Sequence, residues 1–384
     1  MKIAALLMAA GRGSRFGGGT PKQFLPLLGR PVIRWAAESL LAEGRIGALL
    51  PVCAPEEAPR VAAALDGLPA VRPPVVGGAA RQASVRAGLE ALAAAGTPPR
   101  LVLVHDAARP IIPPGTVARL LEALEQAPGA IPAQPVADTL KRGEAGRVVQ
   151  TVPREGLYRA QTPQGFRFAA LLAAHRAARA EATDDAALLE AAGETVALVP
   201  GAETNVKITF PEDLARVESL LLARLIPRTG TGFDVHRLAE GRPLVLCGVT
   251  LPFPLGLAGH SDADVGIHAL CDAIYGALAE GDIGRHFPPS ESRWKDADSA
   301  AFLRHAAARI AARGGVLANA DVTLICERPR IAPHAEAMRA RLAALLEAPA
   351  ERISVKATTT EGLGFPGRGE GIAAQAVATV LLPA

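Results

Sequence analysis

The chain has 384 residues, of which 49% are hydrophobic and 21% are charged, and its formal net charge is +3. A chain of this length exceeds what one hydrophobic core usually covers, so we expect two globular domains. The nearly balanced charge argues against a surface for nucleic acid or for an anionic membrane.

The cysteines and the apolar segments bear on the cellular compartment in which the protein is expected. The four cysteines form no CxxC pair, which argues against a disulfide framework or a thiolate zinc site and suits a reducing environment. The longest charge-free run, 243–259, is broken by Pro252 and Pro254, so we expect no membrane span. We therefore expect a cytoplasmic enzyme.

The first half of the chain alternates short apolar runs with amphipathic stretches. Strands are predicted over 3–8, 48–53, 101–104 and 195–199, and helices over 31–42, 80–96, 115–127 and 211–225. This alternation predicts an α/β domain with a doubly wound, mostly parallel sheet, whose binding sites lie at the carboxyl ends of the strands.

A domain boundary is predicted at "IPRTGTG", residues 226–232, where Pro227 and two glycines are expected to end a helix and to allow a turn. The predicted domains are 1–226 and 227–384. In the second domain we expect a smaller α+β fold. Its predicted strands are 231–236, 321–327, 353–358 and 372–381, with a hairpin over 244–252 and helices over 262–280, 298–313 and 333–347.

A glycine-rich segment, "MAAGRGSRFGGGTPKQF" (8–24), directly follows the first predicted strand. Glycines there let backbone N–H groups converge on an anion, and Arg15 and Lys22 can neutralise its charge. The segment lacks the GK[ST] of a Walker A loop, and Phe16 stands where a dinucleotide fingerprint has its third glycine. A flexible turn is the simpler alternative for the glycines alone. The combination G-x-G-x-R…PK resembles the nucleotidyltransferases.

Further segments narrow this resemblance. In order they are "GGAARQASVRAGL", "VHDAARP", "VADTLKR", "TVPREGLYRAQTPQGF", "TDD" and "NVKITFPEDL". Together they resemble the 2-C-methyl-D-erythritol 4-phosphate cytidylyltransferases over residues 1–225. The resemblance implies transfer of CMP from CTP, with Mg²⁺, to methylerythritol phosphate. The implied catalytic residues are Arg15, Lys22, Arg154 and Lys207, and the implied substrate-binding residues are Gly11, Gly13, Gly78, Ser84, Asp106, Arg109 and Thr139.

Simpler explanations exist for some of these side chains. Asp106, at a strand end, could cap the next helix, and Arg154 could be a surface ion-pair partner. Lys207 lies in what reads as an apolar strand, where a lysine needs an anion. Of the histidines in this half, His105 is predicted to be packed and His175 to lie on a helix surface.

Six of the eight histidines lie after residue 230. In "FDVH" (233–236), strand alternation puts Asp234 and His236 on one face. In "GHSDADVGIH" (259–268), a helix begins after a Ser or Asp and carries His268. One Asp and two His form a plausible zinc set with an open fourth position, as catalytic zinc requires. A D-x-H pair alone is more often structural.

The order "GFDVH", "HSDADVGIHALCDAI", "GDIGRHFPPS", "KATTTEGLGFPGRGEG" resembles the 2-C-methyl-D-erythritol 2,4-cyclodiphosphate synthases over 229–384. The resemblance implies Zn²⁺ or another divalent cation on Asp234, His236 and His268, and Mg²⁺ or Mn²⁺ at Glu361. His260 and Thr359 would assist catalysis, and residues 326–332 would receive the cytidine. The remaining implied substrate-binding residues are Ser261, Asp282, Ile283, Gly284, Thr358, Thr360, Phe365 and Arg368.

Some positions depart from this pattern or have simpler roles. Pro289 stands where relatives often have an acid, which puts metal or substrate contacts near it in doubt. Arg330 replaces a lysine common in the cytidine loop, and for it we expect a retained phosphate contact with altered geometry. Asp262 and Asp264 could support the metal ligands, but acidic residues in a first helical turn are a sufficient explanation.

The two implied reactions are separated by one step, because an ATP-dependent kinase must phosphorylate the intermediate between them. We therefore expect association with that kinase or simple co-expression. Relatives of the second domain imply a homotrimer or a hexamer. The alternatives are a sugar-nucleotide pyrophosphorylase fused to a zinc-binding module, or a second domain that serves only binding or assembly.

Overall fold

The computed structural model describes residues 2–11, 19–288, 291, 294 and 297–383. The chain forms two compact units, Met1–Leu221 (unit 1) and Leu222–Ala384 (unit 2). Among the described residues, no helix combines the length and the apolar character that crossing a membrane requires.

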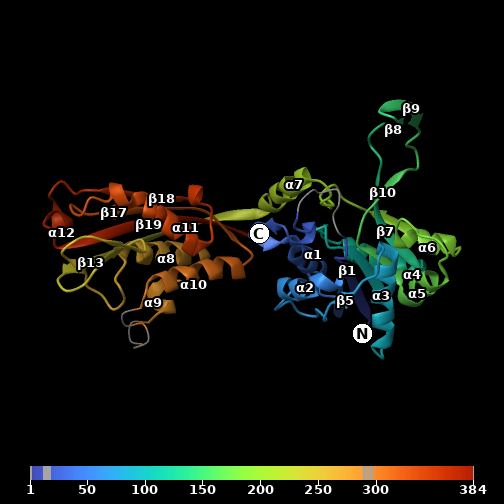
Figure 1. The fold of residues 1–384 in the computed structure, drawn as a ribbon, viewed down its shortest axis with the longest axis horizontal. Helices are drawn as coiled ribbons and strands as arrows, with labels where there is room; N and C mark the ends of the chain where they lie inside the picture. The colour runs from blue at the N-terminus through green and yellow to red at the C-terminus, as the bar shows by residue number, and fades with distance from the viewer. Residues whose placement is uncertain (1, 12–18, 289–290, 292–293, 295–296, 384) are drawn as a thin grey trace. The chain divides into compact units, whose positions relative to one another are not determined.

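Unit 1 is built on an eight-stranded sheet (Figure 1). β1 pairs in parallel with β4 and β6, and β4 with β5, while β11 and β10 run antiparallel to their neighbours. The strand order is β10-β7-β11-β6-β1-β4-β5, with β12 paired to β7. The strands are β1 (Ile3–Met8), β4 (Ala48–Cys53), β5 (Val75–Val76), β6 (Leu101–Asp106), β7 (Gly129–Pro135), β10 (Tyr158–Ala160), β11 (Gln164–Arg167) and β12 (Val196–Pro200).

Helices cover both faces of this sheet. On β1, Ala5 and Leu7 pack in one cluster with α1 and α4, whereas Ala4 and Leu6 pack in another with α3 and α5. Strand side chains alternate between faces, so both faces are buried and the predicted doubly wound, mostly parallel sheet is confirmed. The helices are α1 (Val32–Leu41), α2 (Ala58–Ala64), α3 (Arg81–Ala94), α4 (Thr116–Gln126), α5 (Phe168–Ala177), α6 (Asp185–Ala191) and α7 (Pro211–Leu222).

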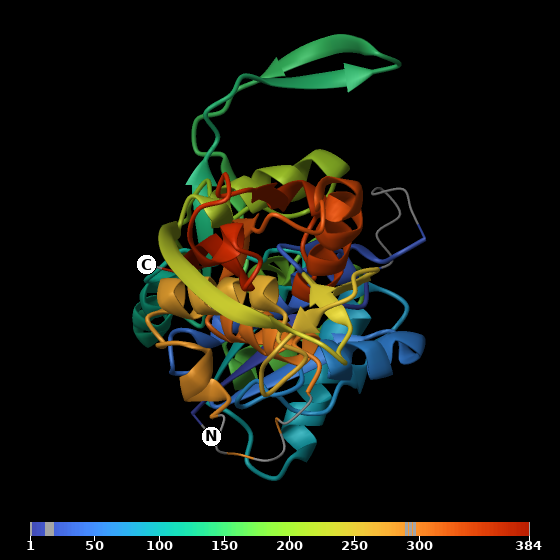
Figure 2. The same ribbon diagram turned by 90° about the vertical axis from the view of Figure 1, so that its left-hand side faces the viewer.

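A hairpin of β8 (Leu140–Glu144) and β9 (Arg147–Val152) projects from the body of unit 1 in both views (Figures 1 and 2). Its turn places Ala145 and Gly146 at positive φ, as tight hairpin turns require. Val148 is 66% exposed and Val149 51%. The sequence pattern did not predict this hairpin, because its apolar residues do not alternate with polar ones along either strand.

Unit 2 contains a five-stranded sheet in the order β16-β13-β19-β17-β18. Its strands are β13 (Leu225–Ala239), β16 (Gly256–Leu257), β17 (Val316–Ile325), β18 (Ile353–Thr358) and β19 (Gly371–Pro383), and β14 (Leu244–Leu246) pairs separately with β15 (Val249–Leu251). The helices are α8 (Val265–Leu278), α9 (Ile283–His286), α10 (Ala300–Ala312), α11 (Ala335–Leu346) and α12 (Gly364–Gly367). The predicted α+β class is confirmed.

The predicted turn at 226–232 is wrong, since β13 starts at Leu225 and continues through this segment. It pairs with β19 from Leu225 onward. Gly230 and Gly232 serve a different purpose: a Cβ atom at either position would collide with backbone atoms of α8, at Ala273 and Ala269 respectively. The glycines therefore allow the helix to lie directly against the strand.

Candidate active sites

A cavity of about 730 Å³ lies in unit 1 where strands β1, β4 and β6 end. The cavity therefore lies at the carboxyl ends of the strands, where the sequence pattern predicts the site. Its lining includes the end of β1 with Gly11, the Gly77–Gly78 turn before α3, and charged side chains from several separate segments. These charged residues are Lys22, Glu56, Arg81, Asp106 and Lys207.

Cations and one buried carboxylate are closely paired in this cavity. Lys207 Nζ lies 2.6 Å from Asp106 Oδ2, and Arg81 Nε lies 3.8 Å from Asp106 Oδ1. Lys22 Nζ donates to the Ile208 carbonyl at 2.8 Å. Lys207 lies in the loop between β12 and α7, not in a strand as the apolar pattern predicted. The loop brings the two lysines to the same wall.

The environment keeps Asp106 ionised. Burial alone would raise the pKa of its carboxyl, but the charges of Lys207 and Arg81 hold that pKa well below its usual range. Burial would lower the pKa of Arg81, yet Asp185 and Asp106 raise it. The cavity wall therefore places two cations against a buried negative charge, Asp106, and this arrangement suits the binding of phosphate groups and of a hydroxyl.

Arg81 was not predicted as a site residue, although it lies in the quoted segment 77–89. Its Nη1 is 2.8 Å from Asp185 Oδ2, and His175 Nε2 donates to Asp185 Oδ1 at 2.9 Å. His175 is 1% exposed, so its predicted position on a helix surface is wrong. Its burial follows from the partner carboxylate on α6, which no local sequence pattern reveals.

The predicted residues of unit 1 fall into three groups. Gly11, Lys22, Gly78, Ser84, Asp106 and Lys207 line the cavity. Arg15 and Gly13 lie outside the described residues. Thr139 and Arg154 are exposed residues next to the β8–β9 hairpin. These two residues and Arg109 are not among the described residues that line the cavity.

Arg109 lies behind the wall of the cavity. Its Nη1 donates to the Asn205 carbonyl at 2.6 Å, two residues before Lys207. Burial lowers the pKa of its guanidinium, against the raising effect of Asp106. In this structure Arg109 therefore holds the loop that carries Lys207.

His105 is fully buried beside Asp106, as its predicted packing requires. Its Nε2 faces the Arg109 carbonyl at 3.0 Å, and Thr162 Oγ1 lies 3.1 Å from its Nδ1. A carbonyl can only accept, so Nε2 carries the proton. Burial lowers the pKa of His105 to about 4, so it stays neutral at physiological pH.

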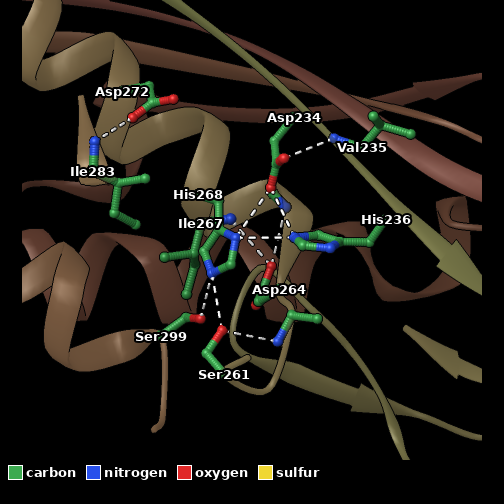
Figure 3. Close-up of polar contacts among 12 residues, drawn as sticks. Asp234, Val235, His236, Ser261, Asp264, Ile267, His268, Asp272, Ile283 and Ser299 are labelled. Atoms are coloured by element: carbon green, nitrogen blue, oxygen red, sulfur yellow. Dashed lines mark hydrogen bonds and ion pairs between the residues drawn. The ribbon is translucent and has the colours of Figure 1, made fainter. Parts of the chain in front are cut away.

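In unit 2, the side chains of Asp234, His236 and His268 converge (the metal group, Figure 3). Asp234 Oδ2 lies 3.0 Å from His236 Nε2 and 3.0 Å from His268 Nδ1, and the two nitrogens are 3.2 Å apart. β13 supplies two of these residues and α8 the third. This is the set that the sequence pattern predicted.

The donor set of the metal group fits a divalent cation. Donors at tetrahedral zinc with bonds of about 2.0–2.1 Å would lie roughly 3.4 Å apart, close to the observed spacing. The three side chains are 12–26% exposed, so the group is open on one side. Burial would raise the pKa of Asp234, but both histidines hold it well below its usual range. The residues present therefore suit zinc with an open position.

The two acidic residues before α8 differ in their contacts. Asp264 caps α8, accepting from Gly266 N and Ile267 N at 3.1 Å each, so the helix-cap explanation is confirmed for it. Asp262 instead contacts Ser299, and Ser299 Oγ lies 2.9 Å from His268 Nε2. For Asp262 a first-turn role is therefore insufficient.

Other predicted residues lie around the metal group or near it in sequence. Ser261 Oγ is 3.2 Å from His268 Nε2, whereas His260 is exposed. Asp282 caps α9 through Arg285 N at 3.0 Å. Ile283 N donates to Asp272 Oδ1 at 2.7 Å, and this anchors the segment that contains Gly284 (Figure 3).

Glu361 is not brought to the metal group within one chain. It follows β18, and β13 is separated from β18 by β19 and β17, so three strand spacings of roughly 14 Å in total lie between them. Its loop is held by Glu327, which sequence reasoning missed and which accepts from Thr360 N at 2.9 Å. Thr359 donates to Glu361 at 2.9 Å. The neighbouring predicted residues are Thr358, Thr360, Phe365 and Arg368.

Arg368 is exposed and pairs with Glu370 at 2.8 Å. Arg330, one of the two departures, is also exposed. Pro289, the other departure, lies outside the described residues.

Comparisons with known proteins agree with this division. Residues 3–223 match the model of the 2-C-methyl-D-erythritol 4-phosphate cytidylyltransferase family, and residues 227–381 match the YgbB family. The chain is 63% identical to "Bifunctional enzyme IspD/IspF" of Granulibacter bethesdensis, covering 100% of both chains. It is 60% identical to the enzyme of that name from Gluconobacter oxydans, covering 100% of this chain and 99% of that one.

Among solved structures, the bifunctional IspDF from Campylobacter jejuni is 32% identical, with a TM-score of 0.48 and coverage of 100% and 99%. The sequence matches span both units, and they do not favour a sugar-nucleotide pyrophosphorylase. The chain belongs to the family of bifunctional IspD/IspF enzymes.

Proposed function

We propose that each unit catalyses one reaction of the non-mevalonate isoprenoid pathway. In unit 1, the phosphate of 2-C-methyl-D-erythritol 4-phosphate attacks the α-phosphorus of CTP. A new P–O bond forms, the bond to the β-phosphate oxygen breaks, and pyrophosphate leaves. The cluster of Lys22, Arg81 and Lys207 around the cavity supports this assignment, because phosphoryl transfer depends on positioning and on neutralising charge.

Within unit 1 the described residues divide the work. Gly78 and Ser84, at the start of α3, are suited to the nucleoside, and Asp106 is suited to hydroxyls of the acceptor. Lys207 would exchange part of its contact with Asp106 for the acceptor phosphate. Arg15 would join Lys22 at the triphosphate, where Mg²⁺ accompanies CTP.

Thr139 and Arg154 fit this site only when a second copy of the chain presents its hairpin. Both residues lie beside the projecting β8–β9 hairpin, and both are exposed. The exposed Val148 and Val149 support such a contact, because an isolated two-stranded hairpin is marginally stable in water. Arg154 would then direct the acceptor phosphate toward CTP.

In unit 2, the substrate is 4-diphosphocytidyl-2-C-methyl-D-erythritol 2-phosphate. An oxygen of its 2-phosphate attacks the β-phosphorus, and the bond between that phosphorus and the CMP oxygen breaks. The products are 2-C-methyl-D-erythritol 2,4-cyclodiphosphate and CMP. Asp234, His236 and His268 would hold Zn²⁺ or another divalent cation, which when bound supplies charge neutralisation at the phosphates.

The remaining residues of unit 2 orient the substrate. Ser261 stands beside the metal group, His260 would steady the reacting phosphates, and the segment 282–284 would receive the erythritol part. Thr359 and Glu361 would act at the diphosphate, with Mg²⁺ or Mn²⁺ held by Glu361. Glu361 follows β18, three strands away from β13, which carries Asp234 and His236. For Glu361 to act at the diphosphate beside the metal group, its loop must therefore come from a second copy of the chain. A homotrimer or a hexamer satisfies that need, and a monomeric mass in solution would contradict it.

The intermediate kinase reaction connects the two activities. The product of unit 1 lacks the 2-phosphate that unit 2 consumes, so direct transfer between the sites has no chemical basis. We propose association with the kinase. Co-purification at near-physiological concentration tests this, and failure to associate without any change in flux would contradict it.

The observation that carries the proposal is the Asp234–His236–His268 convergence within the segment that matches the YgbB family. The test follows phosphorus NMR of the full chain with CTP, Mg²⁺ and methylerythritol phosphate. Pyrophosphate and a diphosphocytidyl product are expected without the kinase, and cyclodiphosphate and CMP only after the kinase and ATP are added. Use of a hexose phosphate in place of methylerythritol phosphate would contradict the assignment of unit 1.

A further inference from the structure

The two ring nitrogens of His268 face different surroundings (Figure 3). Nδ1 points into the metal group, 3.0 Å from Asp234 Oδ2. Nε2 points away from it, 2.9 Å from Ser299 Oγ and 3.2 Å from Ser261 Oγ. For His268 to serve as a ligand, Nδ1 must present its lone pair, and so Nε2 must carry the proton.

Ser299 is itself held by one carboxylate. Its hydroxyl donates to Asp262 Oδ1, and its backbone N–H donates to Asp262 Oδ2 at 3.1 Å. Ser299 is fully buried, and the backbone N–H of Asp262 donates to the Ala297 carbonyl at 3.1 Å. Both carboxylate oxygens are thus engaged by the residue that contacts His268.

This chain of contacts fixes where the protons lie. A carboxylate only accepts, so the Ser299 hydroxyl proton points to Asp262. The Ser299 oxygen is then left to accept from His268 Nε2–H, which directs the Nδ1 lone pair into the metal group. Ser261 already accepts from Ala263 N at 3.1 Å and lies farther from Nε2, so it is the weaker partner.

His236 is oriented by a different means. Its Nδ1 is 2.9 Å from the Ala258 carbonyl, an obligate acceptor, which leaves Nε2 free of a proton toward the metal group. The backbone therefore performs for His236 what two side chains perform for His268. A side-chain substitution can remove the contacts that orient His268, but not the backbone carbonyl that orients His236.

We propose that Asp262 and Ser299 are positioning residues that fix the tautomer and the orientation of His268, and thereby set the affinity of the site for its cation. This inference rests on the proposed metal site. Partners of this kind typically change metal affinity by about 10–100-fold.

The decisive variant is Asp262→Asn. An asparagine has one accepting oxygen, and if that oxygen faces the Ser299 N–H, the amide NH₂ donates to the Ser299 hydroxyl oxygen. The hydroxyl proton then turns to His268 Nε2, and the proton of the imidazole moves to Nδ1, where it blocks the ligand position. Ser299→Ala removes the acceptor without reversing the polarity, so we expect a smaller loss.

The test is equilibrium competition for Zn²⁺ against a chromophoric chelator, using the metal-free full chain. We expect Asp262→Asn to weaken zinc binding by about 100-fold and Ser299→Ala by about 10-fold. Ser299→Thr keeps the hydroxyl and should retain most of the affinity. Ser219→Ala is the matched control, because Ser219 is exposed on α7 and its hydroxyl donates to the Ala215 carbonyl of the same helix.

Circular dichroism of the metal-free variants shows whether a loss of zinc affinity reflects a loss of folding. If Ser299→Ala does not fold, the zinc affinities of Ser299→Thr and Asp262→Asn are compared instead. Wild-type affinity in folded Asp262→Asn and Ser299→Ala would overturn the inference. Absence of stoichiometric zinc binding by the wild-type chain would instead overturn the proposed metal site.

Discussion

The cavity of unit 1 takes its charges from several short segments and element ends, whereas the metal group of unit 2 takes its donors from one strand and one helix. Lys207 reaches the cavity wall from a loop and Lys22 from a single 3-10 turn, and their positions depend on an ion pair and a carbonyl contact. Asp234 and His236 are fixed by the alternation of β13 and His268 by α8. The charges of unit 1 thus depend on contacts between separate segments, while the donors of unit 2 are held by the regular spacing of one strand and one helix.

The largest effect that this comparison predicts is a separation of the two activities by metal removal. In His236→Ala, CMP release by unit 2 should fall by about 10³-fold or more, because the charge on the phosphates loses several kcal/mol of stabilisation. Pyrophosphate release by unit 1 should be unchanged when Mg²⁺ is present. Chelation followed by zinc addition to the wild-type chain is the reversible control.

Circular dichroism accompanies this measurement. Unit 2 has a large apolar core that does not include the metal group, and a three-ligand site is typical of catalytic rather than structural zinc. We therefore expect the metal-free unit to stay folded. Unfolding on chelation would break the comparison, because the metal would then be structural rather than catalytic.

The next effect concerns the loop-borne charges of unit 1. Lys207→Met should lower the rate of pyrophosphate release by about 10²–10³-fold, since a cation at the transferred phosphate is lost. CMP release by unit 2 should not change. Lys2→Met, which removes an exposed lysine before β1, is the matched control.

Arg154→Met should produce a loss of similar size, although Arg154 is exposed beside the hairpin of its own chain. If a second copy supplies Arg154, refolding a mixture of Lys207→Met and Arg154→Met chains should restore pyrophosphate release. No recovery in a verified mixed oligomer would contradict the shared site and would place Arg154 in the cavity of its own chain.

A smaller effect concerns the loss of stability of unit 1 in acid. His105 has a folded-state pKa of about 4 against 6.5 for the free side chain, so only the unfolded chain binds a proton between these values. The stability contributed by neutral His105 is complete above pH 6.5 and is lost as the pH falls toward 4. The total loss for unit 1 is roughly 3 kcal/mol.

Urea unfolding of unit 1 between pH 7 and pH 4.5, followed against the same titration of His105→Gln, measures this contribution. The variant should show a shallower decline of the free energy of unfolding with acid. Equal slopes in both proteins would show that His105 is not the group responsible.

Much of this architecture could be predicted because the signals are local. The short apolar runs at 48–53 and 101–104 predicted buried strands, and β4 and β6 occupy them. The ligands Asp234 and His236 follow from the two-residue period of a strand. Family motifs located Lys22, Ser84 and Asp106 at one cavity.

The remainder depends on contacts between distant segments. The burial of His175 requires Asp185 on another helix, and the isolation of Glu361 requires the order of strands in the sheet. Neither is encoded by spacing or by composition. The glycines at 230 and 232 were misread as a turn, because a glycine that avoids a collision looks the same in sequence as one that bends the chain.

Those glycines have a consequence for the metal group. A methyl group at position 232 would push against the carbonyl oxygen of Ala269, which directly follows His268 in α8. The helix would then have to retreat from the strand that carries Asp234 and His236. The separation between the donors on β13 and the donor on α8 thus depends on Gly232, which contributes no donor and has no side chain. A survey restricted to the ligand positions would overlook this residue.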